Sequence, residues 1–205
     1  MALALTAAEI ACEREAPPAP AVSREVSPAI IEGCQQGDRA ALEHFVLNYQ
    51  NLVFAFLSRM VGNRPEVEDL AQEVFIRAYR ALPRYQLRAD ARVSTWLLTI
   101  AVRLVQDRRK RRRPVLVPLY DDLVADDATH PERAQRQREI ARAFERAAAQ
   151  LTHEQRAVFV LAQFHGLTMA QIGEVIGVPA NTVKTRLYRA RERLRTLLSD
   201  LREAQ

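Results

Sequence analysis

The stretch that decides the fold is TMAQIGEVIGVPANTVKTRLYRARERLR, residues 168–195. Thr168 and Gln171 have the spacing of a capping box at the start of a helix, and Gly177 stands where a left-handed residue would end that helix. A second helix is expected to open near Asn181. Its inner face carries Val183, Leu187 and Leu194. This pattern predicts a helix-turn-helix, whose second helix enters the major groove of DNA.

The second helix of this hairpin is crowded with cations. They are Lys184, Arg186, Arg189, Arg191, Arg193 and Arg195. An ordinary helical hairpin with a solvated basic face has the same pattern. The rest of the chain has to decide between the two interpretations.

The composition favours a helical protein with a polyanionic partner. The chain has 205 residues, of which 48% are hydrophobic and only six are glycine, so it can bury one or two modest cores. Its net charge is +5 and its pI about 9.7. Because the basic residues are clustered, nucleic acid is the expected partner.

Several other classes of protein are disfavoured. The two cysteines and four histidines lack the spacing of a disulfide framework or a metal site. No phosphate-binding glycine pattern or nucleophile–base motif is present, no apolar run approaches 18 residues, and the N-terminus lacks the positive region of a signal peptide. We therefore expect a cytoplasmic protein that is not an enzyme, binds no cofactor or metal and has no stable membrane insertion.

Four segments are expected along the chain. Residues 1–27, rich in Ala and then in Pro, are predicted to be a disordered tail. Residues 28–113 and 132–205 have helical periodicity without any strand pattern. Residues 114–131 hold four aspartates and no Lys or Arg, which indicates an acidic linker, either a solvated spacer or a segment that imitates nucleic acid. The predicted fold class is all-α, with two small helical domains and the helix-turn-helix in the second.

One helix of the first domain has two distinct faces. It is expected to begin around residues 63–66 and to end at Leu82-Pro83. The apolar face carries Val67, Leu70, Ala71, Val74, Phe75, Ala78 and Tyr79. The opposite face carries Asp69, Gln72, Glu73, Ile76 and Arg80. An acidic face with an exposed isoleucine is either a docking surface or merely solvated.

A further helix is expected to follow a polar loop, with Ser94 or Thr95 as its cap. Its apolar side carries Trp96, Leu97, Ile100, Ala101 and Leu104. It runs into six consecutive cations at residues 108–113. These repel one another, and a polyanion offsets that repulsion.

Three ordered blocks resemble the extracytoplasmic-function group of bacterial sigma factors, in the sigma-70 family. They are EDLAQEVFIRAYRAL (68–82), STWLLTIAVRLVQDRRKR (94–111) and LTHEQRAVFVLAQFHGLTMAQIGEVIGVPANTVKTRLYRARERLR (151–195). The resemblance implies a transcription initiation factor. Its first domain would bind core RNA polymerase and open the promoter −10 element, its second would read the −35 element, and an anti-sigma factor would regulate it.

The resemblance also implies site residues, position by position. Core-polymerase binding falls on Asp69, Gln72, Glu73 and Arg77. Binding of −10 DNA falls on Arg88, Arg92, Ser94, Thr95, Trp96, Arg103, Asp107, Arg108, Arg109 and Lys110. Binding of −35 DNA falls on Asn181, Lys184, Thr185, Arg186, Tyr188 and Arg189.

Some features depart from the family pattern or stay open. The loop 86–93 reads QLRADARV, where the family is usually rich in Gly, Ser or Phe, so the −10 specificity does not transfer. Trp96 either contacts a base or belongs to the core. Two rival functions also remain: a sigma mimic that sequesters an anti-sigma factor, and a stand-alone helix-turn-helix regulator. The mimic would lack the DNA-facing cations, and the regulator leaves residues 64–113 unexplained.

Overall fold

Two groups of helices make up the part of the chain that the structure describes. The computed structural model describes residues 25–61, 64–86, 92–111, 135, 143–144 and 146–203. The first group contains α2 (Pro28–Gln35), α3 (Arg39–Val61), α4 (Arg64–Ala81), the 3-10 turn η1 (Leu82–Arg84) and α5 (Val93–Arg111). The second contains α7 (His153–Gln163), α8 (Met169–Ile176) and α9 (Ala180–Glu203). These residues contain no strand, and the all-α prediction is confirmed. The predicted linker 114–131 lies outside the described residues.

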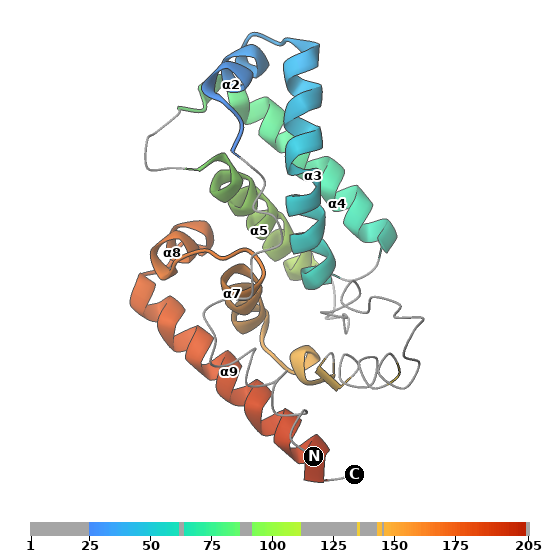
Figure 1. The fold of residues 1–205 in the computed structure, drawn as a ribbon, viewed down its shortest axis with the longest axis vertical. Coiled ribbons are helices and arrows are strands. Elements are labelled where there is room, and N and C mark those ends of the chain that lie inside the picture. The colour runs from blue at the N-terminus through green and yellow to red at the C-terminus, as the bar shows by residue number, and fades with distance from the viewer. Residues whose placement is uncertain are drawn as a thin grey trace.

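Helix α3 is the longest helix of the first group and packs against α2, α4 and α5 (Figure 1). Its buried positions recur every three to four residues, which is the period of an α-helix with one face on a core. They include Ala41, Phe45, Tyr49, Val53, Phe56, Leu57 and Met60. The rings of Phe45 and Tyr49 meet edge to face with centroids 5.1 Å apart. Val46, Leu47 and Phe54 remain exposed on the outer side.

Helix α4 buries most of its predicted apolar face. Val67, Leu70, Ala71, Val74 and Ala78 are buried, and Phe75 packs against the core. Two details of the prediction are wrong. Tyr79 is 55% exposed and Ile76 is half-buried. The buried line runs through Ala78 to Leu82, which is the i, i+4 direction along the helix, and this leaves Tyr79 at its edge.

The two groups share one continuous core. Helix α8 packs on α5 and α7 packs on α3 (Figure 1). Between them, the Nε of buried Arg156 donates a 2.9 Å hydrogen bond to the carbonyl of Arg59. The Arg59 guanidinium lies 4.5 Å from the ring centroid of Phe164, a favourable cation–π contact. Burial lowers the pKa of Arg156 to about 10.

A histidine also lies in this interface. The ring of His165 packs edge to face on Phe56, with centroids 5.9 Å apart. Burial, and to a lesser degree the charge of Arg59, lowers its pKa to about 3. His165 is therefore neutral at physiological pH, and the interface contains an uncharged imidazole.

The N-terminal segment packs on the first group. Val26 N donates to the Tyr49 hydroxyl at 3.2 Å, and that hydroxyl donates to Glu25 at 2.8 Å. The last three residues of the predicted tail, 25–27, thus have defined positions. Residues 1–24 lie outside the described residues.

Candidate nucleic-acid interface

The helix-turn-helix is built as the sequence predicts. Thr168 accepts a hydrogen bond from Gln171 N, and the Gln171 side chain accepts one from Thr168 N, which completes the capping box. Such a cap stabilises a helix by about 0.5–2 kcal/mol. Gly177 ends α8 in the left-handed conformation, with φ 73°. Val183, Leu187 and Leu194 are buried, so the predicted inner face of α9 is confirmed.

A second glycine fixes the turn between these helices. A Cβ on Gly173 would lie 2.6 Å from the carbonyl oxygen of Val178, closer than real Cβ contacts allow. Val178 N donates to the Gly173 carbonyl at 2.9 Å. Gly173 therefore lets the turn return closely along α8, and this closeness sets the direction of α9.

The first turns of α9 carry the residues predicted to read −35 DNA. Asn181, Lys184, Thr185, Tyr188 and Arg189 are exposed, and Arg186 is half-buried. The Tyr188 side chain is 66% exposed. Because the five exposed residues recur every three to four positions, they share the side of α9 away from its buried face, and Arg186 lies at the edge of that side. The helix thus offers hydroxyl, amide and cationic groups together on one surface.

The later turns of α9 contact their surroundings. Arg193 donates to the Gln150 side chain at 3.1 Å, and Arg195 is paired with Glu192. These contacts tie the cations to neighbouring residues of the second group. Both arginines remain exposed.

The start of α5 differs from the prediction. The helix begins at Val93, so Ser94 and Thr95 lie inside it and neither is its cap; they are 4% and 8% exposed. The physical reason is a distant carboxylate. Glu25 accepts hydrogen bonds from Ser94 Oγ at 2.5 Å and from Ser94 N at 3.4 Å, and so satisfies helix-end donors that a local cap would otherwise take.

Trp96 is half-buried beside this point. Its ring lies 4.5 Å from that of Tyr85, centroid to centroid, in a tilted arrangement. It also packs against the core. Arg92, just before the helix, is exposed. Arg88 lies outside the described residues.

The cations at the end of α5 are partly paired. Arg108 Nε lies 2.5 Å from Glu66 of α4, and Arg109 lies 3.0 Å from Glu154 of α7. Lys110 lies 4.0 Å from Asp107, one turn earlier. Arg103 is exposed. Arg111 is the last described residue of the run, so the full basic stretch 108–113 lies only in part within the described residues.

The predicted docking face of α4 is largely exposed. Asp69 and Gln72 are exposed, and Glu73 forms a 2.7 Å ion pair with Arg77 one turn later. Both partners of this pair keep about 40% of their side chains exposed. An exposed pair of this kind contributes little to stability. A partner can therefore reach both side chains and break the pair at little energetic cost.

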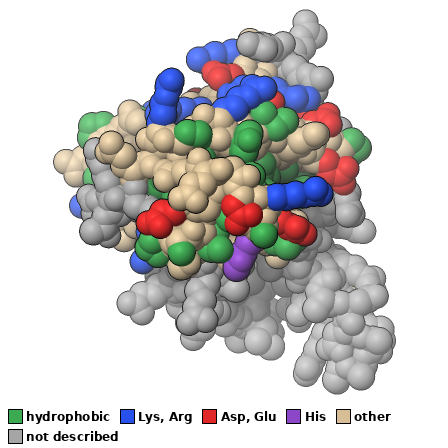
Figure 2. All heavy atoms as spheres, turned by 90° about the horizontal axis from the view of Figure 1, so that it is seen from above, with side chains coloured by type: hydrophobic (Ala, Val, Ile, Leu, Met, Phe, Trp, Pro, Cys, Tyr) green, Lys and Arg blue, Asp and Glu red, His purple; other side chains and the backbone are tan. Residues whose placement is uncertain are grey.

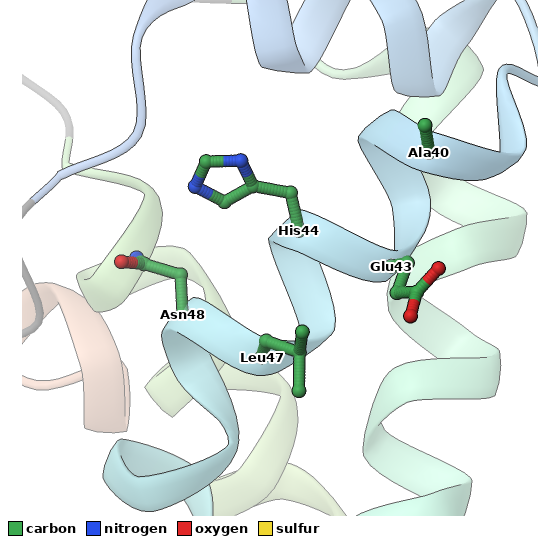
Figure 3. Close-up of a pocket in the computed structure, with 5 residues that line it drawn as sticks. All are labelled: Ala40, Glu43, His44, Leu47 and Asn48. Carbon is green, nitrogen blue, oxygen red and sulfur yellow. The ribbon is translucent and has the colours of Figure 1, made fainter.

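The described residues also include a hollow on α3. A shallow hollow on α3 is lined by Ala40, Glu43, His44, Leu47 and Asn48, all from consecutive turns of one helix (Figure 3). From the end that carries α2, most Lys and Arg side chains lie toward one edge, and acidic ones are spread over the rest (Figure 2). Within the described residues, no cluster of three His, Cys, Asp or Glu side chains could hold a metal, and no helix is long and apolar enough to cross a membrane.

Sequence reasoning missed two residues of these surfaces. Glu25 was assigned to the tail, and nothing local marks it as a partner of Ser94. Gly173 did carry a signal, because a glycine inside a short amphipathic helix often marks a close packing contact.

Comparison with known proteins agrees with this geometry. Two family models match: Sigma-70 region 2 over residues 45–115 and Sigma-70, region 4, over residues 141–194. The ECF RNA polymerase sigma factor SigW of Bacillus subtilis is 34% identical over 182 residues, which cover 83% of this chain and 96% of SigW. The RNA polymerase sigma-H factor of Pseudomonas aeruginosa is 34% identical over 199 residues, 89% of this chain and 100% of that protein.

Solved structures share the fold. CnrH, solved in complex with the cytosolic domain of CnrY, superposes with a TM-score of 0.61 at 22% identity, covering 84% of this chain and 96% of CnrH. The sigma factor RpoE of Bartonella quintana, solved with the anti-sigma factor NepR, gives 0.57 at 20% identity, with coverages of 77% and 96%. The chain therefore belongs to the sigma-70 family, in the extracytoplasmic-function group of RNA polymerase sigma factors, and is a transcription initiation factor, not an enzyme.

Proposed function

We propose that this sigma factor directs polymerase to promoters through three separate surfaces. The outer face of α4, with Asp69, Gln72, Glu73 and Arg77, binds core RNA polymerase. The start of α5 and the loop before it capture the melted −10 element. The first turns of α9 read the −35 element in duplex DNA.

The exposure pattern of α9 is the observation that carries this proposal. Its donors and acceptors at residues 181–189 are exposed or half-buried, while Val183 and Leu187 hold the helix on its domain. A helix presented in this way can enter a major groove without rearrangement. A bidentate contact from Arg186 or Arg189 to guanine would contribute roughly 1–3 kcal/mol of discrimination.

The cations of α5 support the second surface. Arg103, Arg108, Arg109 and Lys110 would contact phosphates, which gives affinity that falls with salt and carries no sequence information. Arg108 and Arg109 would exchange Glu66 and Glu154 for DNA. Melting costs unstacking energy, and binding of unpaired bases near Trp96 would offset it.

The exposed acidic face of α4 supports the first surface, the one that binds core polymerase, since charge complementarity steers and orients a docking partner. We further propose that an anti-sigma factor regulates the chain, as NepR is the partner of RpoE in the solved complex named above. The chain would act in the cytoplasm, where core polymerase and promoter DNA are found.

Transcript mapping tests the proposal. Purified chain is added to core polymerase on genomic DNA, and transcript 5′ ends are mapped with and without it. The proposal expects starts that depend on the chain and share two upstream sequence blocks. Sequence-specific DNA binding without any such transcript would indicate a helix-turn-helix regulator. Binding to neither DNA nor core would indicate a mimic.

A further inference from the structure

Glu25 reaches the start of α5 from a position 69 residues earlier in the chain. Its carboxylate accepts hydrogen bonds from Ser94 Oγ at 2.5 Å, from Ser94 N at 3.4 Å and from the Tyr49 hydroxyl at 2.8 Å. Val26, the next residue, is held through its backbone N–H on the same Tyr49 hydroxyl. The Glu25 carboxylate thus accepts hydrogen bonds from both donors of Ser94, its hydroxyl and its backbone N–H.

The groups around Glu25 are of the kind that bind a nucleic-acid strand. A hydroxyl and a backbone N–H at a helix start favour an anion or a base carbonyl, and the Tyr85 and Trp96 rings offer stacking surface close by. The hydroxyls of Tyr85 and Thr95 are buried without a hydrogen-bond partner among the described residues. Buried unpaired hydroxyls are unfavourable. These two hydroxyls are therefore available to hydrogen-bond a ligand, and Glu25 bonds to neither of them.

We propose that Glu25 is an intramolecular cover for the −10 site, and that residues 25–27 move aside when single-stranded promoter DNA binds. This inference rests on the proposed function, because Ser94 belongs to the −10 surface through the family resemblance. The carboxylate holds the Ser94 donors in the absence of DNA, and the DNA strand takes them in the open complex.

Charge favours a cover over a support. A carboxylate beside Ser94 repels the phosphates of an incoming strand, so Glu25 and DNA compete for the same place. Burial raises the pKa values of Tyr49 and Tyr85, and the negative charge of Glu25 acts in the same direction on both. The Glu25 carboxylate accepts a hydrogen bond from one of these phenols, that of Tyr49.

The segment that carries Glu25 also lies at the surface and outside any helix. Glu25 is exposed, and residues 25–27 form no helix. Its departure must break its hydrogen bonds to Ser94 and Tyr49 and that of Val26, and must withdraw the half-buried Val26 side chain from the core. The apparent dissociation constant for DNA then equals the intrinsic constant divided by the open fraction. A cover that is closed in nine of ten molecules lowers the affinity tenfold.

Substitution of Glu25 tests the proposal in the holoenzyme. The probe is a fluorescein-labelled single strand that carries the non-template −10 region of a mapped promoter. Glu25→Ala should raise its affinity about tenfold, which corresponds to about 1.4 kcal/mol, and Glu25→Gln should raise it less because an acceptor for Ser94 remains. The matched control is Glu32→Ala, an exposed glutamate of α2, which should change nothing. Core binding should be the same in all variants.

Hydrogen exchange without DNA gives a second readout. Glu25→Ala should speed exchange of the Ser94 amide, since its acceptor is lost. Faster exchange with unchanged or weaker DNA binding would overturn the cover and make Glu25 a support of α5. Trp96→Ala and Arg103→Ala test the underlying assignment: if neither weakens probe binding, the −10 site itself is wrong. If they weaken it while Glu25→Ala brings no gain, only the cover is wrong.

Discussion

The start of α9 and the start of α5 present their proposed DNA-binding residues in opposite ways. On α9, five of the six are exposed and a rigid turn fixes the helix. On α5, Ser94 and Thr95 are buried, Trp96 packs against Tyr85, and Glu25 accepts hydrogen bonds from Ser94. Both regions belong to one chain and serve one promoter in the proposed function.

The difference matches the form of DNA that each region would meet. Duplex DNA offers base edges in its major groove without any change of structure, so a prepared surface suits it. Unpaired bases exist only after melting, and a site for them can stay covered until that step. The comparison therefore predicts that DNA binding by α9 requires the helix to be held in a fixed position. DNA binding by the start of α5 requires the contacts with Glu25 to break first.

The position of α9 should be most sensitive to substitution at Gly173. Gly173→Ala should lower the free energy of unfolding by about 2–3 kcal/mol, because the new Cβ meets the Val178 backbone oxygen. Gly177→Ala is the matched control. It should cost about 1 kcal/mol, since only its left-handed φ is strained and its Cβ has open space. Urea unfolding measures both, and a larger cost at Gly177 would contradict the packing role of Gly173.

Docking to polymerase should be separable from both DNA regions. Gln72→Lys with Glu73→Lys should weaken core binding by about tenfold, since like charges at an interface are strongly unfavourable. The measurement is competition for core against a labelled sigma factor. Glu32→Lys with Gln36→Lys makes the same charge change on exposed residues around the end of α2 and should have no effect. Equal loss in both pairs would point to net charge and against a docking face on α4.

The interface between the two groups should weaken in acid. The unfolded pKa of His165 is 6.5 and the folded one about 3, so below pH 6.5 the unfolded state binds the additional proton. Stability is then lost as pH falls, by about 1 kcal/mol between pH 7 and 5.5. His165→Phe keeps a ring against Phe56 and should remove this part of the pH dependence. Urea midpoints at the two pH values report it, and equal slopes for both proteins would show that His165 does not contribute.

Local patterns predicted the helix-turn-helix well. Thr168, Gln171 and Gly177 define the ends of α8 through contacts within a few residues, and the apolar period of α9 identifies its buried face. The all-α class and the main apolar face of α4 follow from the same periodicity. Such features depend on neighbours in sequence and can be read from it.

Contacts between distant segments could not be predicted. The cap of α5 comes from Glu25, so the local rule that chose Ser94 or Thr95 selected residues inside the helix. The core between the groups uses Arg59, Arg156 and His165, which are residues that sequence patterns assign to surfaces. Their burial depends on partners about a hundred residues away.

The most direct test of the account is a cycle of protein and promoter changes at the −35 element. Transcripts are counted for wild type and for Arg186→Ala with Arg189→Ala, each on an intact and a −35-scrambled promoter. Arg193→Ala with Arg195→Ala serves as the charge-matched control on the same helix. The account predicts that the Arg186 and Arg189 variant loses about two orders of magnitude on the intact promoter, keeps its core binding, and loses nothing further on the scrambled one. Losses that simply multiply, or an equal loss in the control, would contradict the claim that the first turns of α9 read the −35 element.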